Sequence, residues 1–505
     1  MASALSSSRT KTAFLASRLN HIGVIFMTAF DEKTEQRLMN DIMELLVTHY
    51  GAELPEDALD QELERVEMAL NDAREFHQGQ VRKSGELYIF HPLRVAHLAA
   101  RHWMDFASVT ASLLHDVVED TPVTVADVRV KYGDEVAHLV DGLTKVTSEA
   151  MSRDDLKKET YKKTLLVAID DIRVLCLKFW DRIDNLYTLD ALPPYKQKLI
   201  AEETRTVYVP LARHLGMGYV STELESLSHS VLYPKRAKRY QRAVQDLQQE
   251  TSSYLRQIRA KIHNNCEKQK LSVLVKERWR PFTIAAAREM RRGFVALFTL
   301  EVQVDRMMDA YLFLGILHSL FPPIPGKLRD HLNQTSQHGY MALKTTVQAE
   351  EQRMRVEITT RKLARFNQAG VLAPGFSFRH DNFRTLMKSL MDGESAFDTE
   401  SLKLASATIQ VYTPHGEVRK LPEGSSVLDF AFDIHDSVGL HACRAVINGR
   451  IRQLKTRLLD GDQVEVETAE EPEVLPKWLE WAITPRARNS IRRYLRKKVR
   501  SAKAE

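Results

Sequence analysis

The segment 112–122, SLLHDVVEDTP, sets four ionisable side chains into a run whose apolar residues otherwise recur at the spacing of a buried helix. Charged groups are costly to bury unless they are paired or bind a metal. Residues four apart lie one above the other on a helix. We therefore expect one continuous helix here, with His115 stacked on Glu119 and Asp116 on Asp120.

Two other segments supply groups of the same kind. The stretch VRKSGELYIFHP places His91 at the start of a helix, and LCLKFWDRIDNLYTL places Asp181 after an apolar run. Together with His115 and Asp116, they give two imidazoles and two carboxylates on three helices. This mixed set suits a divalent ion such as Mn²⁺ or Fe²⁺ better than a closed structural zinc site. A satisfied core histidine beside a solvated acidic turn would explain the His115–Asp116 pair alone, but not the whole set.

The remaining charges near these ligands suggest hydrolysis of an anionic substrate. Glu119 and Asp120 could orient and deprotonate an attacking water molecule. Arg82 and Lys83 precede His91 by nine and eight residues and could face an anion. A solvated basic turn is the alternative for Arg82 and Lys83.

The 505 residues are enough for about three domains. Residues 35–234 have helical periodicity throughout. Residues 271–348 are mixed: LSVLVKE and FVALFTLEVQVD are expected to be strands, and MMDAYLFLGILHSLF a helix. Residues 405–468 are β-rich, with a short helix at SVLDFAFDIH, and the tail from residue 476 is helical and basic.

Charge and cysteine content restrict the function classes. The formal net charge is only +5, and the nine Lys or Arg of residues 481–505 account for the basic character. That tail could contact RNA, or it could pack on the preceding β-rich unit with a solvated basic face. The three cysteines lie far apart in the sequence, so neither a disulfide framework nor a Cys-based zinc site is supported, and a reducing compartment is the simplest interpretation.

The sequence predicts neither a membrane span nor a clear targeting peptide. The longest apolar runs are far too short to span a bilayer, so no membrane association is expected. The first 30 residues contain no acid and are faintly like a targeting peptide. A disordered extension over 1–34 is the favoured interpretation, with Met27 as an alternative start.

The motifs resemble those of a known family. RKSGELYIFHP, SLLHDVVEDTP, VDGLTKV and DRIDNLYTLDALP together resemble the hydrolase domain of RelA/SpoT homologues, within the wider HD phosphohydrolase group. YVPLARHLGM and ELESLSHSVLYP continue the resemblance to about residue 235. It implies removal of the 3′-pyrophosphate from ppGpp and pppGpp, with one Mn²⁺ ion as cofactor.

The resemblance also implies roles for particular residues. The metal ligands would be His91, His115, Asp116 and Asp181, and the water-activating pair Glu119 and Asp120. The nucleotide pocket would be lined by Arg82, Lys83, Ser84, Asn185 and Thr188. Two positions depart from the family pattern DRLHNMRTL, because Asp184 replaces a histidine and Tyr187 an arginine. These departures bear on how the ligands are oriented.

The next region resembles the family's synthetase domain without its working residues. Segments 309–332 and 338–347 match its skeleton, but no lysine occurs between Lys276 and Lys327, where phosphate-binding lysines are expected. FVALFTLEV has no aspartate for Mg²⁺, and Arg355 stands where the family has its catalytic glutamate. Thr359, His338 and Lys344 replace an arginine, an asparagine and a histidine. Phosphoryl transfer needs cations and a metal-bound carboxylate, so we expect no synthetase activity.

The predicted fold is therefore multidomain. We expect an all-α HD-type metal hydrolase domain over 35–235 and an α/β, nucleotidyltransferase-like pseudo-synthetase domain with a leading helix over 236–395. Residues 405–468 closely resemble a small, β-grasp-like TGS domain, and 469–505 form a basic helical tail. In the family's long members the TGS module touches tRNA on the ribosome, so the resemblance implies contact with tRNA, the ribosome or a regulatory protein.

The predicted function is a cytoplasmic, hydrolase-only enzyme for ppGpp and pppGpp. One alternative is a catalytically silent ribosome- or RNA-binding regulator, and all six retained hydrolase positions argue against it. The other is an HD phosphohydrolase for another nucleotide, such as NADPH or a deoxynucleotide. The RKSG stretch and the attached TGS unit argue against that one.

Overall fold

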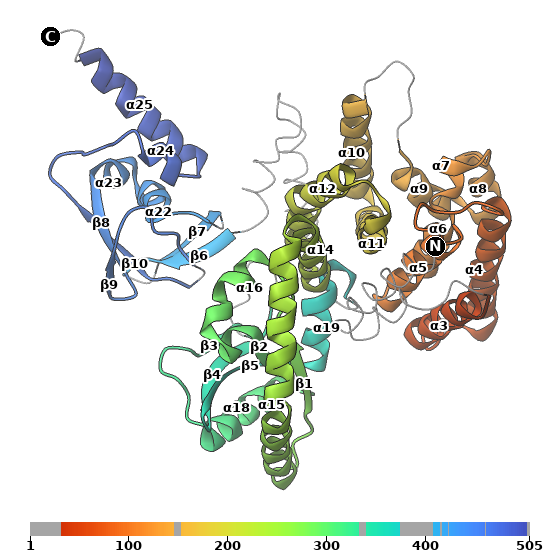
Figure 1. Ribbon diagram of the computed structural model, residues 1–505, viewed down its shortest axis with the longest axis horizontal. Coiled ribbons are helices and arrows are strands. Elements are labelled where there is room, and N and C mark those ends of the chain that lie inside the picture. The colour runs from red at the N-terminus through yellow and green to blue at the C-terminus, as the bar shows by residue number, and fades with distance from the viewer. Residues whose placement is uncertain are drawn as a thin grey trace. The chain divides into compact units, whose positions relative to one another are not determined.

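The computed structural model describes residues 32–145, 153–332, 340–373, 408–414, 417–422, 424–459 and 461–501. The chain forms two compact units, residues 1–397 and 398–505 (Figure 1). Almost all of the predicted extension 1–34, and the end of the predicted pseudo-synthetase domain beyond residue 373, lie outside the described residues.

The N-terminal part of the first unit is helical, as predicted. Its α-helices are α3 (Glu32–Tyr50), α4 (Glu56–Phe76), α5 (Phe90–Arg101), α6 (Phe106–Leu114), α7 (Val117–Asp120), α8 (Val125–Tyr132), α9 (Asp134–Leu143), α10 (Arg153–Asp170), α11 (Arg173–Tyr187), α12 (Pro194–Glu203), α13 (Val209–His214) and α14 (Gly218–Leu232). The short turn η1 (Leu189–Ala191) follows α11, and a π-helical turn, η2 (Thr204–Tyr208), joins α12 to α13.

Helix α5 lies at the centre of this helical part, because every residue from Phe90 to Ala100 is buried. It packs against α3, α6 and α11. Asp105 ends the loop before α6 and caps that helix by accepting a hydrogen bond of 2.9 Å from the Ser108 backbone N–H. This packing brings α5, α6 and α11 together, and these are the elements expected to carry the ligands.

The continuous helix expected through residues 112–120 is wrong. Helix α6 ends at Leu114 and α7 begins at Val117, so His115 and Asp116 form a turn between two helices. Asp116 has φ −90° and ψ −13°, near the sparsely populated bridge region, and the regular hydrogen-bond ladder is interrupted there. Side chains of neighbouring residues diverge on a regular helix, and the turn lets both of these face one site.

The second part of the first unit is a mixed sheet covered by helices. Its strands are β1 (Leu274–Trp279), β2 (Phe298–Val304), β3 (Arg329–Asp330), β4 (Leu343–Ala349) and β5 (Gln352–Thr360), in the order β1-β2-β5-β4-β3. Only β2 and β5 pair in parallel. The long helix α15 (Pro234–Lys268) and α18 (Met307–Leu320) pack on the apolar face of the sheet (Figure 1).

The predicted strand FVALFTLEVQVD begins four residues later than expected. Phe294–Leu297 forms a helical turn, α17, and β2 starts at Phe298. Gly293 precedes the turn with φ +68°, a conformation that favours glycine. The turn lets the rings of Phe294 and Phe298 stack with centroids 4.7 Å apart. Two shorter helices, α16 (Ile284–Glu289) and η3 (Met290–Arg292), come before it.

A backbone contact joins the sheet part to the helical part. After β5, helix α19 (Arg361–Ala369) and the turn η4 (Gly370–Leu372) lie against the turn between α13 and α14. The Val371 N–H donates to the Leu215 carbonyl at 3.1 Å. Gly370 has φ +57° and ψ −121°, and a Cβ there would lie 2.4 Å from that same carbonyl oxygen. Only glycine fits this approach.

The second unit is a small β-rich domain followed by helices, as predicted. It contains β6 (Thr408–Tyr412), β7 (Val418–Pro422), α22 (Val427–Ile434), α23 (Asp436–His441), β8 (Ala442–Ile447), β9 (Arg450–Arg452), β10 (Val464–Thr468), α24 (Trp478–Trp481) and α25 (Pro485–Ser501). Asp429 on α22 accepts hydrogen bonds from the backbone N–H groups of Ile483 and Thr484 and so holds the start of α25. The basic tail therefore packs on this domain through Ala487 and Ile491.

The predicted fold class is confirmed as a helix-rich, multidomain chain with a mixed sheet and a small β domain. Among the described helices, none has a stretch long and apolar enough to cross a bilayer.

Candidate metal centre and substrate pocket

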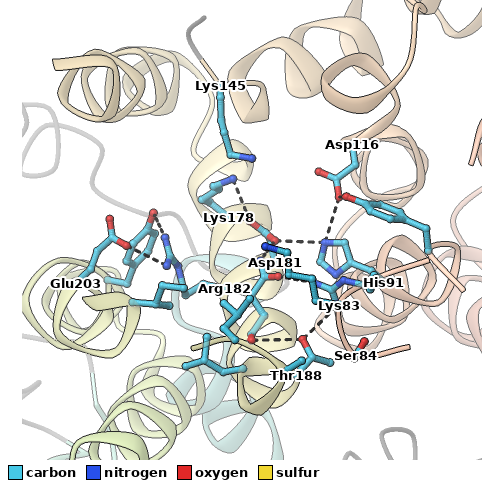
Figure 2. Close-up of a pocket in the computed structure, with 18 of the residues that line it drawn as sticks. Lys83, Ser84, His91, Asp116, Lys145, Lys178, Asp181, Arg182, Thr188 and Glu203 are labelled. Carbon is cyan, nitrogen blue, oxygen red and sulfur yellow. Dashed lines mark hydrogen bonds and ion pairs between the residues drawn. The ribbon is translucent and has the colours of Figure 1, made fainter. Parts of the chain in front are cut away.

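The four predicted metal ligands come together in the structure. His91 lies in the first turn of α5, His115 and Asp116 in the turn between α6 and α7, and Asp181 on α11 (Figure 2 labels His91, Asp116 and Asp181). Ligand atoms of His91, His115 and Asp116 lie within 4.8 Å of one another. His91 Nε2 is 3.4 Å from Asp116 Oδ2 and 3.4 Å from Asp181 Oδ1.

The donor atoms fit a divalent cation. The other ring nitrogen, Nδ1, is occupied in both histidines: it donates to the Ser112 carbonyl at 2.7 Å in His115 and to Asp184 Oδ2 at 2.6 Å in His91. His115 Nε2 is buried and has no hydrogen-bond partner among the described residues. Two imidazole nitrogens and two carboxylates thus converge, a set typical of Mn²⁺- or Fe²⁺-type sites.

The electrostatics of this cluster keep the carboxylates ionised. Burial alone would raise the pKa of Asp116, but His115 and His91 outweigh it and lower the pKa to about 2. The pKa of Asp181 is likewise held well below its usual value, against its burial, by Lys178 and His91. Burial would lower the pKa of His91, yet the carboxylates of Asp184 and Asp181 raise it to about 9. A cation bound here would therefore have to displace a proton from His91.

The predicted water-activating pair, Glu119 and Asp120, lies on α7, which begins directly after Asp116. Both oxygens of Glu119 are held by Lys145, one by its backbone N–H at 2.7 Å and one by its ammonium at 2.5 Å. Asp120 Oδ2 lies 2.7 Å from the Tyr88 hydroxyl, which is also 2.8 Å from Asp116 Oδ2. One hydroxyl has one proton to donate, so Tyr88 links Asp120 to a candidate ligand. The roles of Glu119 and Asp120 stay predictions.

A cavity of about 840 Å³ opens beside the ligands. All five predicted pocket residues line it, namely Arg82, Lys83, Ser84, Asn185 and Thr188, as do His91, Asp116 and Asp181 (Figure 2). Arg82 donates to Asn185 Oδ1 at 2.6 Å and to Thr188 Oγ1 at 3.2 Å. The loop before α5 and the end of α11 are therefore tied together at the cavity wall.

Several lining residues escaped the analysis of the sequence. Lys145, Lys178 and Arg182 bring three cationic groups to the cavity, and Tyr88 lies beside the ligands. Lys178 pairs with Asp181 at 3.0 Å. Residues three apart on a helix are neighbours, so the spacing of Lys178 and Asp181 in the sequence could have predicted this pair. Lys145 was present in the motif VDGLTKV, but its contact with Glu119 joins positions 26 residues apart.

Three family models match segments of this chain. Residues 69–218 match the model described as HD domain, 268–373 the region found in RelA / SpoT proteins, and 409–468 the TGS domain. A protein of Aquifex aeolicus named guanosine-3′,5′-bis(diphosphate) 3′-pyrophosphohydrolase is 32% identical over 481 residues, which cover 92% of this chain and 68% of that protein. The chain belongs to the RelA/SpoT family.

Two other RelA/SpoT relatives carry different names. The bifunctional (p)ppGpp synthase/hydrolase SpoT of Escherichia coli is 31% identical, with 91% of this chain and 67% of that protein covered. The probable GTP pyrophosphokinase of Mycobacterium leprae is 34% identical, with 87% and 60% covered. The family therefore includes proteins named for breakdown and for synthesis, and the chain spans only 60–68% of these relatives' length.

The two departures from the RelA/SpoT motif have different surroundings. Asp184 is buried beside His91 and accepts its Nδ1–H. Tyr187 donates to Glu223 Oε1 on α14 at 2.5 Å and is not among the residues that line the cavity described above. Asp184 therefore belongs to the environment of the candidate metal centre, whereas Tyr187 contributes to helix packing.

The polar face of the sheet in the RelA/SpoT region is filled by pairs within the chain. Glu357 on β5 contacts Arg278 on β1, accepts from the Tyr340 hydroxyl at 2.7 Å and lies 3.8 Å from Lys344 Nζ on β4. Arg355 donates to the Ala296 carbonyl at 2.5 Å. These cationic groups thus contact oxygens of the protein itself.

Proposed function

We propose that this chain hydrolyses ppGpp and pppGpp to GDP and GTP, releasing pyrophosphate, and that it depends on one Mn²⁺ ion. The observation that carries the proposal is the convergence of His91, His115, Asp116 and Asp181 beside a cavity that also presents cationic side chains. His91, Asp116 and Asp181 line this cavity, and His115 lies next to them. Metal-assisted hydrolysis needs both parts, a donor set for the cation and positive charge for the phosphates.

Residues of the chain itself would bind the substrate and transfer the protons. Arg82 and Lys83 bind and orient the anionic nucleotide, and Lys145 and Lys178 add positive charge near the metal ligands. Asp120 or Glu119 takes a proton from the attacking water. The water oxygen bonds to phosphorus as the bond from phosphorus to the ribose 3′ oxygen breaks, so that pyrophosphate leaves. The carboxyl group then returns its proton to the 3′ oxygen. A divalent cation, when bound, supplies charge neutralisation and lowers the pKa of water.

Glu119 has to turn toward the cavity before it can act as a base, because it is not among the residues that line the cavity. In the structure both of its oxygens accept hydrogen bonds from Lys145. A phosphate group that attracts the Lys145 ammonium would release one of these oxygens. Substrate binding and base activation would then be linked through one lysine.

We further propose that the chain makes no ppGpp. Pyrophosphate transfer needs cationic groups around the phosphates and a metal-bound carboxylate. Arg355 occupies the expected glutamate position, and no lysine occurs between Lys276 and Lys327. Contact of the TGS domain with tRNA, the ribosome or a regulatory protein, and a cytoplasmic location, stay predictions.

The test uses the purified full chain with ppGpp and Mn²⁺, and pyrophosphate release is measured. Asp116→Ala should abolish release, whereas Asp190→Ala, which alters an exposed carboxylate after α11, should leave it unchanged. Incubation with ATP and GDP should yield no ppGpp. Hydrolysis undiminished by Asp116→Ala or by a chelator would contradict the proposal. Faster turnover of NADPH or a deoxynucleotide would favour the alternative phosphohydrolase.

A further inference from the structure

A cluster of charged side chains contacts His91 on its Nδ1 side, through Asp184. Arg94 on α5 donates to Asp184 Oδ1 at 2.5 Å and to both oxygens of Glu86 at 2.8 and 2.9 Å. Arg82 lies 3.1 Å from Asp184 and 3.1 Å from Glu86. The exposed fractions of the Asp184, Glu86 and Arg94 side chains are 0%, 1% and 2%. The buried guanidinium of Arg94 and the partly exposed one of Arg82 therefore balance the two buried carboxylates.

Such a cluster is weak evidence for stability. Taking charges out of water costs several kcal/mol per ion, and apolar residues of similar volume are often at least as stable as a buried ion pair. A role in orienting another group is a better explanation when one member contacts that group. Here Asp184 is that member, because it accepts the His91 Nδ1–H at 2.6 Å.

The hydrogen bond from Nδ1 determines what His91 presents to the cavity. With Nδ1 engaged by Asp184, the Nε2 atom faces Asp116 and Asp181, each 3.4 Å away. Metal-binding histidines generally donate their other N–H to a carboxylate or a carbonyl, which fixes the ring and makes the ligand atom more basic. The Ser112 carbonyl has this role for His115.

We propose that Asp184, held in place by Arg94, is the positioning residue that orients His91 for metal binding. This inference rests on the metal site of the proposed function. The same role accounts for an aspartate, rather than a histidine, at position 184. A neutral imidazole has one acceptor nitrogen, so it could not accept from both Arg94 and His91 as the carboxylate does.

The test measures Mn²⁺ binding to the full chain, without substrate, by the electron paramagnetic resonance signal of free Mn²⁺. Asp184→Asn keeps the shape of the side chain but removes its charge, and it should weaken Mn²⁺ binding by roughly 10- to 100-fold. Asp184→His should weaken it as well. Asp190→Asn is the matched control and should bind like the unchanged protein, because Asp190 is exposed.

The outcomes separate this inference from the proposed function. If the unchanged protein binds no Mn²⁺, the metal site itself is refuted. If it binds and folded Asp184→Asn binds within twofold of it, Asp184 only contributes to packing and the inference is overturned. Circular dichroism of each metal-free variant checks folding. Should Asp184→Asn not fold, Arg94→Lys is used instead. It keeps the charge but cannot bridge Glu86 and Asp184 with a planar fork, and unchanged Mn²⁺ affinity would overturn the inference equally.

Discussion

Replacing Gly370 with alanine should loosen the contact between the sheet part and the helical part of the first unit. Gly370 has φ +57° and ψ −121°, and a Cβ there would lie 2.4 Å from the Leu215 carbonyl oxygen and 2.6 Å from the Met217 nitrogen. These are backbone atoms, so no side-chain rotation can relieve the overlap. The turn η4 would have to move away from the turn between α13 and α14.

The size of the effect follows from two contributions. A non-glycine residue in such a sparsely populated backbone conformation costs about 1–3 kcal/mol. Moving η4 away also breaks the hydrogen bond from the Val371 N–H to Leu215, which is 3.1 Å long and is worth about 1 kcal/mol. We therefore expect the local free energy of opening at this contact to fall by about 2–4 kcal/mol.

Amide hydrogen exchange of the full chain measures this directly. The Val371 amide should exchange roughly 30- to 1,000-fold faster in Gly370→Ala, because each 1.4 kcal/mol is a factor of ten. Gly315→Ala is the control: Gly315 lies in α18, a Cβ there meets nothing within 4 Å, and the substitution should stabilise that helix by about 1 kcal/mol. Exchange at Val371 within threefold of the unchanged protein would refute the reasoning.

Three other predictions concern stability. The pKa values of His97 and His102 are lowered by burial from 6.5 to about 4, so the unfolded chain binds more protons between these values. The contribution of the two histidines to the free energy of unfolding is complete above pH 6.5. It is lost as the pH falls toward 4, by about 1.4 kcal/mol per pH unit for each histidine. Thermal melts at pH 7 and pH 5 should therefore show a smaller pH dependence of stability in His102→Phe. Asp429→Ala should lower the unfolding free energy of the C-terminal unit by about 1–3 kcal/mol, since it removes the acceptor of the Ile483 and Thr484 amides; an unchanged urea midpoint would contradict this. Removing Mn²⁺ with a chelator should lower the melting temperature, because a ligand bound only by the folded state stabilises it; equal melting temperatures would contradict metal binding.

The candidate site could be predicted from the sequence because its donors lie within short, recognisable motifs. His91, His115, Asp116 and Asp181 each follow or begin an apolar run, and helical spacing placed them on buried elements. The break between α6 and α7 was missed because the apolar residues on both sides of it recur at helical spacing. It involves one unusual backbone angle at Asp116 rather than a glycine or a proline.

What remained hidden depends on contacts between distant residues. The sequence suggested that Asp184 changes the environment of the ligands, but not that it would accept from Arg94, 90 residues away. The pairing of Glu119 with Lys145, across 26 residues, was equally invisible. Periodicity reports which face of an element is buried. It carries no information on which polar group of another element lies opposite.

The cluster behind His91 has a consequence for the order in which the chain folds during synthesis. His91, Arg94, His115 and Asp116 all leave the ribosome before α11, which carries Asp184 68 residues after Asp116. At about 5–20 residues per second, that interval lasts roughly 3–14 s. During this interval Arg94 on α5 can pair with Glu86 but not yet with Asp184. Burying its guanidinium with only one carboxylate partner is costly. We therefore expect the helical part of the first unit to close late in a nascent chain, when α11 arrives.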